Sequence, residues 1–363
     1  MKCSALCTIP ALMSIVLLSS CSSGTSTTTS STNAYATAYQ SAKFNNGTGG
    51  NMTVSFPSSC SMTVTGTGLP YQHQTYYLVP VANGGTVVAT TPSGIQLQVS
   101  PYSGGISTTA KAISATFNTC PTKATSTTAT SGGAIGLLFS GTVLFNPYEA
   151  TSTVALGDNA SYTFTSGGTS YTAYFVDPCN QHTTGGSSGS TWHFHGVPTC
   201  WTTTVDGTSG PSHIIGIALD GYPIYGGYDI NGAAVKVSAL DACNGITSAT
   251  PEFPSGAYHY VLPVNTTTAQ SSIDCFAGTV DATLSAQMQK LACKMPMLLA
   301  SGKARLPDGR EVSRAEATAW MQQTMPGMNM PFDAGSMPGM KMASNTQPIP
   351  GKDAGGSHTM AGM

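Results

Sequence analysis

The chain has 363 residues, with 13 Lys and Arg against 15 Asp and Glu and a formal net charge of -2. Only 8% of the residues are charged and no basic stripe is present, so we expect no nucleic-acid partner. The polar residues are mostly Ser, Thr, Asn and Gly, which favour strands and turns over exposed helices. We predict a mainly β fold, sandwich- or barrel-like, tied by disulfides and rich in loops, with a small C-terminal helical segment.

The first residues have the pattern of an export signal. Lys2 supplies a positive charge and an apolar run over 11–18 follows, too short to span a bilayer. Residues 18–21 read Leu-Ser-Ser-Cys, which resembles a bacterial lipobox, where cleavage precedes a cysteine that is then acylated. We therefore expect a signal peptide over 1–20, lipidation of Cys21 and a flexible tether over 21–46.

The protein would then be exported and attached to a membrane through Cys21, either at the outer membrane or facing the periplasm. An ordinary signal peptide with an incidental cysteine is the alternative. Export makes disulfides the expected state of the seven cysteines beyond Cys21. Proximity in sequence favours pairing Cys179 with Cys200 and Cys243 with Cys275, although sequence alone does not prove connectivity. These pairs would leave Cys60 for Cys120, and Cys293 would be spare.

Short β-prone runs separated by Gly, Pro and Asn occupy the region from residue 51 to about residue 175. Within residues 95–99 apolar and polar side chains alternate strictly, as in a half-buried strand. Between residues 177 and 276 Gly and Pro recur too often for a helical period, so we expect loops and short strands there. The clearest strand candidates are residues 76–79, 86–89, 95–99 and 135–139.

Helical patterns occur only near the C-terminus. Over residues 281–298 apolar side chains recur every three or four positions, which predicts an amphipathic helix with Cys293 near its last turn. Ser313 and Glu316 fit a capping box that begins a second helix ending near Gln323. We assign two short helices to 279–324 and a disordered tail to 325–363.

Most histidines lie between residues 182 and 259, among recognisable motifs. Trp192-His193-Phe194-His195 is followed by Ser212-His213, Asp220-Gly221-Tyr222-Pro223, Asp241-Ala242-Cys243-Asn244 and Tyr258-His259-Tyr260. This succession is similar to the YHYH domain, a biochemically uncharacterised family, and we place the domain at 47–278. Trp192 and Phe194 stand where the family motif has tyrosines, so any role that needs those two hydroxyls is absent.

A metal site is the chemistry that this histidine segment suggests. His193 and His195 lie two residues apart on an extended segment, so both imidazoles face one side and can chelate one ion. Imidazole suits copper, zinc and other late metals. An alternative role for Asp220 is to orient an imidazole, and the histidines can also be core residues bonded to backbone carbonyls. The donors available to complete the site are His259, His213, His182 and Asp220.

The C-terminal tail carries a second signal for metal. Eight of the 16 methionines lie between Met325 and Met363, and Met-x-x-Met-x-Met occurs twice. Thioethers are soft, neutral ligands that select Cu(I). A low-complexity tail or an adhesive surface for a partner is the alternative. The predicted ligands are Met325, Met328, Met330, Met337, Met340 and Met342.

Together these patterns indicate an exported, lipid-anchored protein that binds copper through a histidine cluster and a methionine-rich tail. One alternative is a metal-dependent enzyme in which His193, His195 and His259 hold the ion. Protons would then be handled by Tyr258, Tyr260 or Asp220. Another alternative is a structural or adhesive surface domain without metal. The sequence identifies no catalytic residue and no protein partner.

Overall fold

The computed structural model describes residues 33–43, 52–81, 85–99, 110–130, 132–149, 153–183, 191–289, 296–298, 301–306 and 310–324. The predicted signal peptide, the predicted lipidation site Cys21, Cys293 and the predicted methionine ligands from Met325 to Met342 lie outside the described residues. Among the described residues no helix is long and apolar enough to cross a bilayer.

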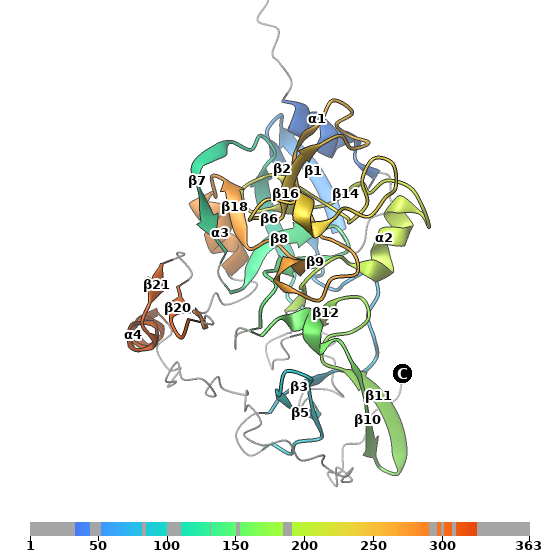
Figure 1. Ribbon diagram of the computed structural model, residues 1–363, viewed down its shortest axis with the longest axis vertical. Helices are drawn as coiled ribbons and strands as arrows, with labels where there is room; N and C mark the ends of the chain where they lie inside the picture. Colours follow the sequence, from blue (N-terminus) through green and yellow to red (C-terminus); the bar gives the residue numbers. More distant parts are fainter. Residues whose placement is uncertain are drawn as a thin grey trace, which may run out of the picture. The chain divides into compact units, whose positions relative to one another are not determined.

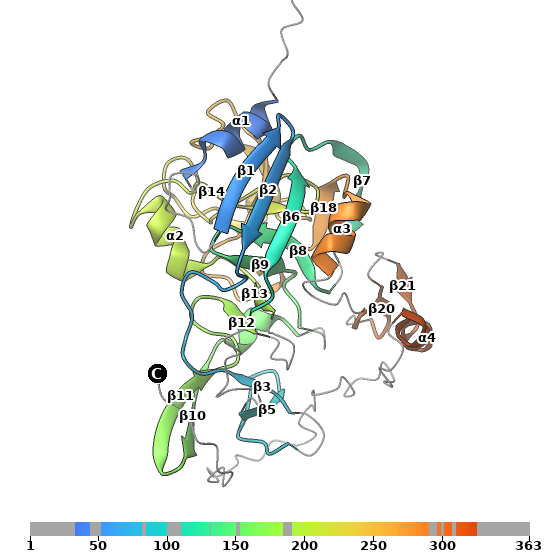
Figure 2. The ribbon, with the colours of Figure 1, turned by 180° about the vertical axis from the view of Figure 1, so that it is seen from behind.

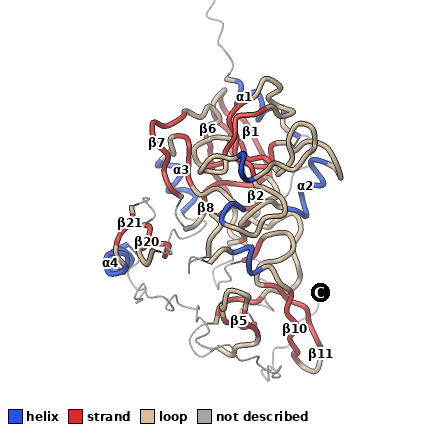
Figure 3. Tube along the Cα trace, viewed as in Figure 1, coloured by secondary structure: helices blue, strands red, loops and turns tan. Residues whose placement is uncertain are grey.

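The largest element is an eight-stranded mixed sheet with the order β12-β13-β9-β8-β14-β15-β17-β16. Figure 1 labels β8, β9, β12, β14 and β16 of this sheet. Its end strands β12 and β16 do not pair with each other in the described part of the chain, so the sheet is open. The mainly β prediction is confirmed, and Figure 3 shows strands and loops making up most of the described chain. The strands are β8 (Ala134–Leu138), β9 (Thr142–Phe145), β12 (Gln181–Thr183), β13 (Trp192–Phe194), β14 (Ile214–Ala218), β15 (Pro223–Tyr225), β16 (Gly245–Ser248) and β17 (Ala257–Val261).

A three-stranded antiparallel sheet of β1, β2 and β6 shares a core with the large sheet, which makes the fold sandwich-like (Figure 2). Met62 on β2 and Phe117 on β6 belong to the same buried cluster as Leu137 on β8. The remaining strands form small sheets. Their bounds are β1 (Met52–Ser58), β2 (Ser61–Gly66), β3 (Leu78–Pro80), β4 (Ala89–Thr90), β5 (Gln96–Val99), β6 (Ile113–Asn118), β7 (Lys123–Ala129), β10 (Ser161–Ser166), β11 (Thr169–Tyr174), β18 (Cys275–Gly278), β19 (Met297–Leu298), β20 (Ala304–Arg305) and β21 (Glu311–Val312).

Three of the four predicted strand runs become strands at nearly the expected positions. Residues 76–79 contribute to β3, 95–99 to β5 and 135–139 to β8. The run 86–89 is shifted, because pairing with β5 begins at the Val88 amide, which donates to the Leu97 carbonyl, and β4 itself is Ala89–Thr90. Ile95 and Leu97 are fully buried, as the alternation predicts, but the pattern ends there, because Gln98 is buried and Val99 is only partly buried.

The predicted tether over 21–46 is wrong for residues 33–43, which carry helix α1 (Ala34–Ser41), and the rest of it lies outside the described residues. The Asn33 side chain caps it by accepting from the Tyr35 amide at 3.0 Å. Tyr39 is fully buried, and its hydroxyl donates to the Gly221 carbonyl at 3.0 Å. Burial of this one aromatic ring fixes a segment whose composition reads as flexible.

Helix α2 (Thr199–Asp206) corrects the expectation that residues 177–276 contain no helix. Its sequence is rich in threonine, whose β-branched side chain lowers helix propensity. The helix is stabilised instead by tertiary contacts, since Trp201 and Val205 are buried and Cys200 is tied by a disulfide.

The predicted helix over 281–298 is shorter than expected. Helix α3 covers Ala282–Gln289, and Met297–Leu298 is instead β19, which pairs with β20. The capping box is confirmed, because the Ser313 amide donates to Glu316 Oε2 at 2.8 Å and the Glu316 amide donates to Ser313 Oγ at 3.2 Å. Helix α4 follows over Arg314–Thr324.

The two disulfides that proximity in sequence favours are present, together with the pair that they leave over. They are Cys60–Cys120, Cys179–Cys200 and Cys243–Cys275. The second one ties the turn before β12 to α2, and the third ties the turn before β16 to β18.

A candidate metal centre on the β12–β13 hairpin

The hairpin of β12 and β13 brings three histidines together. In its antiparallel register His182 lies directly opposite His193. His195 follows two residues later, and its amide donates to the Asn180 carbonyl at 3.1 Å, which continues the pairing. Side chains two residues apart on a strand share a face, so all three imidazoles lie on the same side of the hairpin. The prediction that His193 and His195 point together is confirmed.

The three rings converge on one small volume. One ligand atom from each of His182, His193 and His195 can be chosen so that all lie within 4.8 Å of one another. The Nε2 atoms of His182 and His195 are 3.1 Å apart. The side chains are buried, with exposed fractions of 5%, 3% and 1% for the three residues in chain order. Three imidazoles at these distances can share one ion.

Backbone carbonyls orient two of the rings. The Nδ1 of His193 lies 3.1 Å from the Thr191 carbonyl, and the Nδ1 of His195 lies 2.6 Å from the Asn146 carbonyl. A neutral imidazole that donates from Nδ1 carries its lone pair on Nε2, which is the arrangement of a metal-binding histidine held from outside. The Nδ1 of His182, in contrast, is buried without a hydrogen-bond partner.

A carboxylate that the sequence analysis did not identify completes the cluster. Glu149 Oε1 lies 3.2 Å from the Nε2 of His182 and 3.5 Å from the Nε2 of His195, and this buried oxygen has no hydrogen-bond partner. Glu149 follows β9, where its amide donates to the Thr153 carbonyl. A carboxylate oxygen beside three imidazole nitrogens gives a mixed nitrogen and oxygen donor set suited to zinc, copper or another late metal.

Aromatic side chains enclose the imidazoles. Phe145 stacks on His193 with ring centroids 3.9 Å apart, and Phe175 meets His182 edge-on at 4.9 Å. These walls exclude water, which strengthens electrostatic interactions inside the cluster.

The apolar surroundings also control protonation. Burial, with a smaller contribution from the neighbouring imidazoles, holds the pKa of His182 well below its ordinary value, and the same causes act on His193. Burial lowers the pKa of His195 to about 4. Burial and the charge of Asp158 raise the pKa of Glu149 to about 8. The three imidazoles are therefore neutral at pH 7 and ready to act as ligands.

The other predicted donors lie elsewhere. His213 Nδ1 pairs with Asp206 Oδ1 at 3.1 Å, and His259 packs against Tyr225. Neither belongs to the histidine group found among the described residues. Asp220 does not orient an imidazole, because its Oδ2 accepts from the Tyr260 hydroxyl at 2.6 Å and from the Gly278 amide at 2.8 Å.

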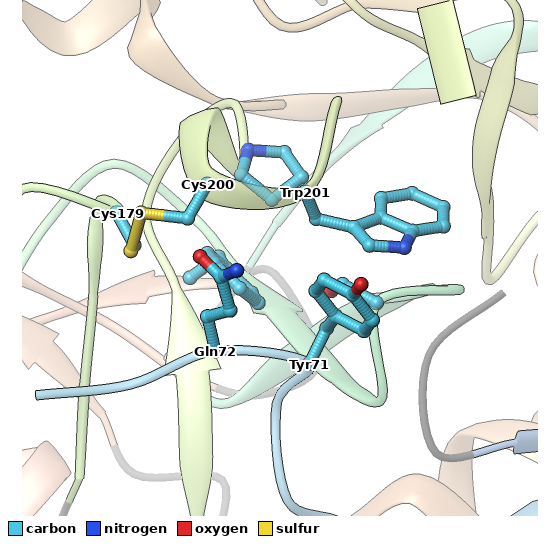
Figure 4. Close-up of a pocket in the computed structure, with 8 residues that line it drawn as sticks. Tyr71, Gln72, Cys179, Cys200 and Trp201 are labelled. Carbon is cyan, nitrogen blue, oxygen red and sulfur yellow. A yellow bond between two sulfur atoms is a disulfide. The ribbon is translucent and has the colours of Figure 1, made fainter. Parts of the chain in front are cut away.

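A shallow hollow lies next to the hairpin and is shown in Figure 4. Tyr71, Gln72, Trp201 and the Cys179–Cys200 disulfide line it, together with Phe194. Since Phe194 alternates with the two histidines along the chain, the hollow is on the opposite face of β13 from the imidazoles. It is therefore separate from the metal centre.

The chain was compared with known families, curated proteins and solved structures. The family model described as YHYH protein matches residues 114–238 and 229–278. Residues 47–113, which the sequence predicted to belong to the domain, lie outside the match. No curated protein and no solved structure matches the chain. All four residues of the candidate metal centre lie within the matched region.

Proposed function

We propose that this chain, which carries a YHYH-family domain in residues 114–278, binds one late transition-metal ion through His182, His193 and His195, with Glu149 beside them. The observation that carries the proposal is the convergence of three buried, neutral imidazoles within 4.8 Å. On this proposal the ion is copper.

A purely structural role accounts for only part of this arrangement. Bonds to backbone carbonyls explain His193 and His195 as core residues. They leave unexplained the buried Oε1 of Glu149, which has no hydrogen-bond partner although it lies 3.2 Å from the Nε2 of His182. Leaving a buried polar atom unpaired costs about 1 to 3 kcal/mol. An ion at the centre would give the Glu149 oxygen and the imidazole nitrogens a common partner.

The choice of copper is supported by chemistry outside the cluster. Imidazole nitrogen binds copper well, and the two Met-x-x-Met-x-Met motifs of the tail offer soft ligands for Cu(I). The lipobox-like segment before Cys21 and the three disulfides are consistent with an exported, lipid-anchored protein in an oxidising compartment. We include export and acylation of Cys21 in the proposal. Metabolic labelling with palmitate tests the acylation, and the label is expected to disappear in Cys21→Ser.

Elemental mass spectrometry on the mature protein after exposure to copper tests the metal site. We expect copper in the wild type and in a version ending at Gln323, which lacks the methionine tail. His182→Ala should lose this copper, whereas His213→Ala, which changes a histidine outside the cluster, should retain it. Retention by His182→Ala, or loss of all copper with the tail, would contradict a site in the histidine cluster.

A metal-dependent enzyme is the second candidate, and Glu149 is the observation that favours it. Its carboxyl group lies 3.2 Å from the Nε2 of His182 and 3.5 Å from that of His195, so it could accept a proton from, or donate one to, a group bound at the ion. The EPR spectrum of the Cu(II) protein separates the two candidates. A spectrum that shifts on adding azide would indicate an open coordination position, and an unchanged spectrum would favour a binding protein.

A further inference from the structure

The eight-stranded sheet has the same organisation when followed from either end. Starting at β12 or at β16, the first pairing is antiparallel, the second is parallel and the third is antiparallel. The two halves meet at the antiparallel pair β8–β14. The corresponding strands are β12 and β16, β13 and β17, β9 and β15, and β8 and β14.

The amino-acid sequence of the first half of the sheet also resembles that of the second half. Residues 134–149 align with residues 214–229 without a gap, so that Gly136 matches Gly216 and Tyr148 matches Tyr228. The strand registers follow this alignment, because Gly136 pairs with Leu144 and Gly216 pairs with Ile224. After each hairpin an isolated bridge forms at the matching place, Tyr148 with Val154 and Tyr228 with Ala234.

The two glycines mark the axis between the halves. A Cβ atom on Gly136 would lie 2.8 Å from the carbonyl oxygen of Ile217, and one on Gly216 would lie 2.5 Å from that of Leu137. Leu137 and Ile217 are themselves matching positions. The same close backbone contact therefore occurs once in each direction across the β8–β14 pair.

A second matching segment precedes β12 and β16. The sequence is Asp-Pro-Cys-Asn over 177–180 and Asp-Ala-Cys-Asn over 241–244. In both turns the aspartate Oδ1 accepts from the cysteine amide, at 2.8 and 2.9 Å, and the asparagine has a positive φ, 67° and 63°. Both cysteines form disulfides to later positions.

From these relationships we infer that the YHYH domain is two copies of one hairpin-and-turn unit, and that only the first copy holds a complete metal site. His259 in the second copy occupies the place of His193 in the first. Each has its Nδ1 next to the carbonyl two residues earlier, at 3.1 Å for His193 and 2.9 Å for His259. Each ring packs on the last residue of the parallel neighbour strand, Phe145 or Tyr225.

The remaining ligand positions differ between the copies. His182 pairs with His193 in the first hairpin, and Ile246 pairs with His259 in the second. The amide of His195 donates to the Asn180 carbonyl, and that of Val261 donates to the Asn244 carbonyl in the same way. Ile246 and Val261 therefore occupy the places of His182 and His195.

The carboxylate also differs between the copies. Asp229 matches Glu149, and both amides close the same turn at 2.8 Å, to Ala233 and Thr153 respectively. The shorter Asp229 side chain accepts from the amides of Asn231 and Ala233 within its own turn. Glu149 is buried against the histidines instead. The second copy thus keeps one imidazole and has neither of the other two nor the carboxylate in place.

The inference predicts that each chain binds one ion at the histidine cluster. It also predicts that a second site can be built around His259. Both expectations rest on the proposed function. Metal content after equilibration with Cu(II) and dialysis tests it, using chains that end at Gln323 so that the tail does not contribute. Ile246→His combined with Val261→His should raise copper from one to two ions per chain. Adding His259→Ala to this pair should return the content to one.

The reciprocal change tests the equivalence of the two copies without metal. His182→Ile combined with His195→Val gives the first copy the residues of the second. This variant should fold with a circular dichroism spectrum like that of the wild type and an unfolding midpoint at or above it, and it should bind no copper. Failure of this variant to fold would overturn the equivalence, whatever the metal results show.

The outcomes separate the two proposals. One ion in both the wild type and the folded Ile246→His, Val261→His variant would overturn the inference and leave the proposed function standing. No ion in the wild type and one in the variant would overturn the proposed function and support the equivalence of the copies. No ion in either protein would overturn both. If the two-histidine variant does not fold, the reciprocal variant decides.

Discussion

The Nε2 atoms of His182 and His195 lie 3.1 Å apart, and the same Glu149 oxygen is 3.2 Å from the first and 3.5 Å from the second. His195 is held from its other side by the Asn146 carbonyl, so its Nε2 is an acceptor in the neutral ring. His182 has no such partner at Nδ1. The cluster is therefore held in position on one side and has unpaired polar atoms on the other.

An ion at this position should stabilise the fold. A ligand that binds only the folded state at a hundred times its dissociation constant adds about 2.7 kcal/mol to the free energy of unfolding. Copper is therefore expected to raise the thermal midpoint of the chain ending at Gln323, and a chelator should reverse the change. His182→Ala should show no rise, whereas His213→Ala should behave like the wild type. An equal rise in His182→Ala would place the binding elsewhere.

The metal-free protein should lose stability in acid through its histidines. Burial keeps the folded pKa of His195 at about 4, and those of His182 and His193 are also lowered, against about 6.5 in an unfolded chain. Between these values the unfolded state binds more protons, so the free energy of unfolding falls as pH drops below about 6.5. Urea denaturation in chelator at pH 7, 5.5 and 4.5 measures this. His182→Ile with His195→Val should show a smaller decrease, and an equal decrease would contradict the assignment.

Glu149 should act in the opposite direction at higher pH. Its pKa rises from 4.5 to about 8 on burial, so between these values the folded state binds the extra proton. Its stabilising contribution is therefore present below about pH 4.5 and is lost as pH rises through 8. Glu149→Gln does not titrate, and in chelator its free energy of unfolding relative to the wild type should rise from pH 5 to pH 8.5. A pH-independent difference would show that Glu149 is ionised in the fold.

Short sequence patterns predicted the features that are determined within a single strand or helix end. The alternation over 95–99, the capping box of Ser313 and Glu316, and the shared face of His193 and His195 each follow from the geometry of a single strand or helix end. The capping box and the shared face are present in the structure, whereas the alternation holds only as far as Leu97, because Gln98 is buried and Val99 is partly exposed. The shared face locates two of the three clustered imidazoles.

The third imidazole and the carboxylate depend on pairing between strands. His182 joins the cluster because of the register of β12 with β13, and Glu149 joins it because β9 runs parallel to β13. Neither relation has a signal within one segment, and His259 was an equally reasonable candidate from spacing. Comparing the chain with itself provides part of the missing signal, since Asp177-Pro-Cys-Asn matches Asp241-Ala-Cys-Asn, and in the structure this match aligns His182 with Ile246, which lies opposite His259.

Helices α1 and α2 were also not predicted, because contacts distant in sequence stabilise them. The threonine-rich α2 has weak intrinsic preference for a helix, and α1, although it contains Ala34, Ala36 and Ala38, is only eight residues long and would be marginal in isolation. Trp201 and Tyr39, both buried, hold these segments to the core. Such long-range burial cannot be recognised from composition.

Removing the Cys179–Cys200 disulfide should affect both stability and metal affinity. Cys179 lies three residues before His182, in the turn where Asp177 Oδ1 accepts from the Cys179 amide at 2.8 Å. The bond closes a separation of 21 residues, and loops of this size contribute about 3 kcal/mol in the chain-entropy model. Cys179→Ala with Cys200→Ala should lower the free energy of unfolding by about this amount.

The matched control is Cys60→Ala with Cys120→Ala, which removes a disulfide between the β1–β2 turn and the end of β6, away from the histidine hairpin. Both variants should be less stable than the wild type. Only loss of the Cys179–Cys200 bond should weaken copper binding, by roughly tenfold or more, because a misplaced supporting group typically costs that much in metal affinity. Isothermal titration at a temperature where both variants remain folded measures the difference. Equal weakening in the two variants would mean that the turn carrying Cys179 does not position His182.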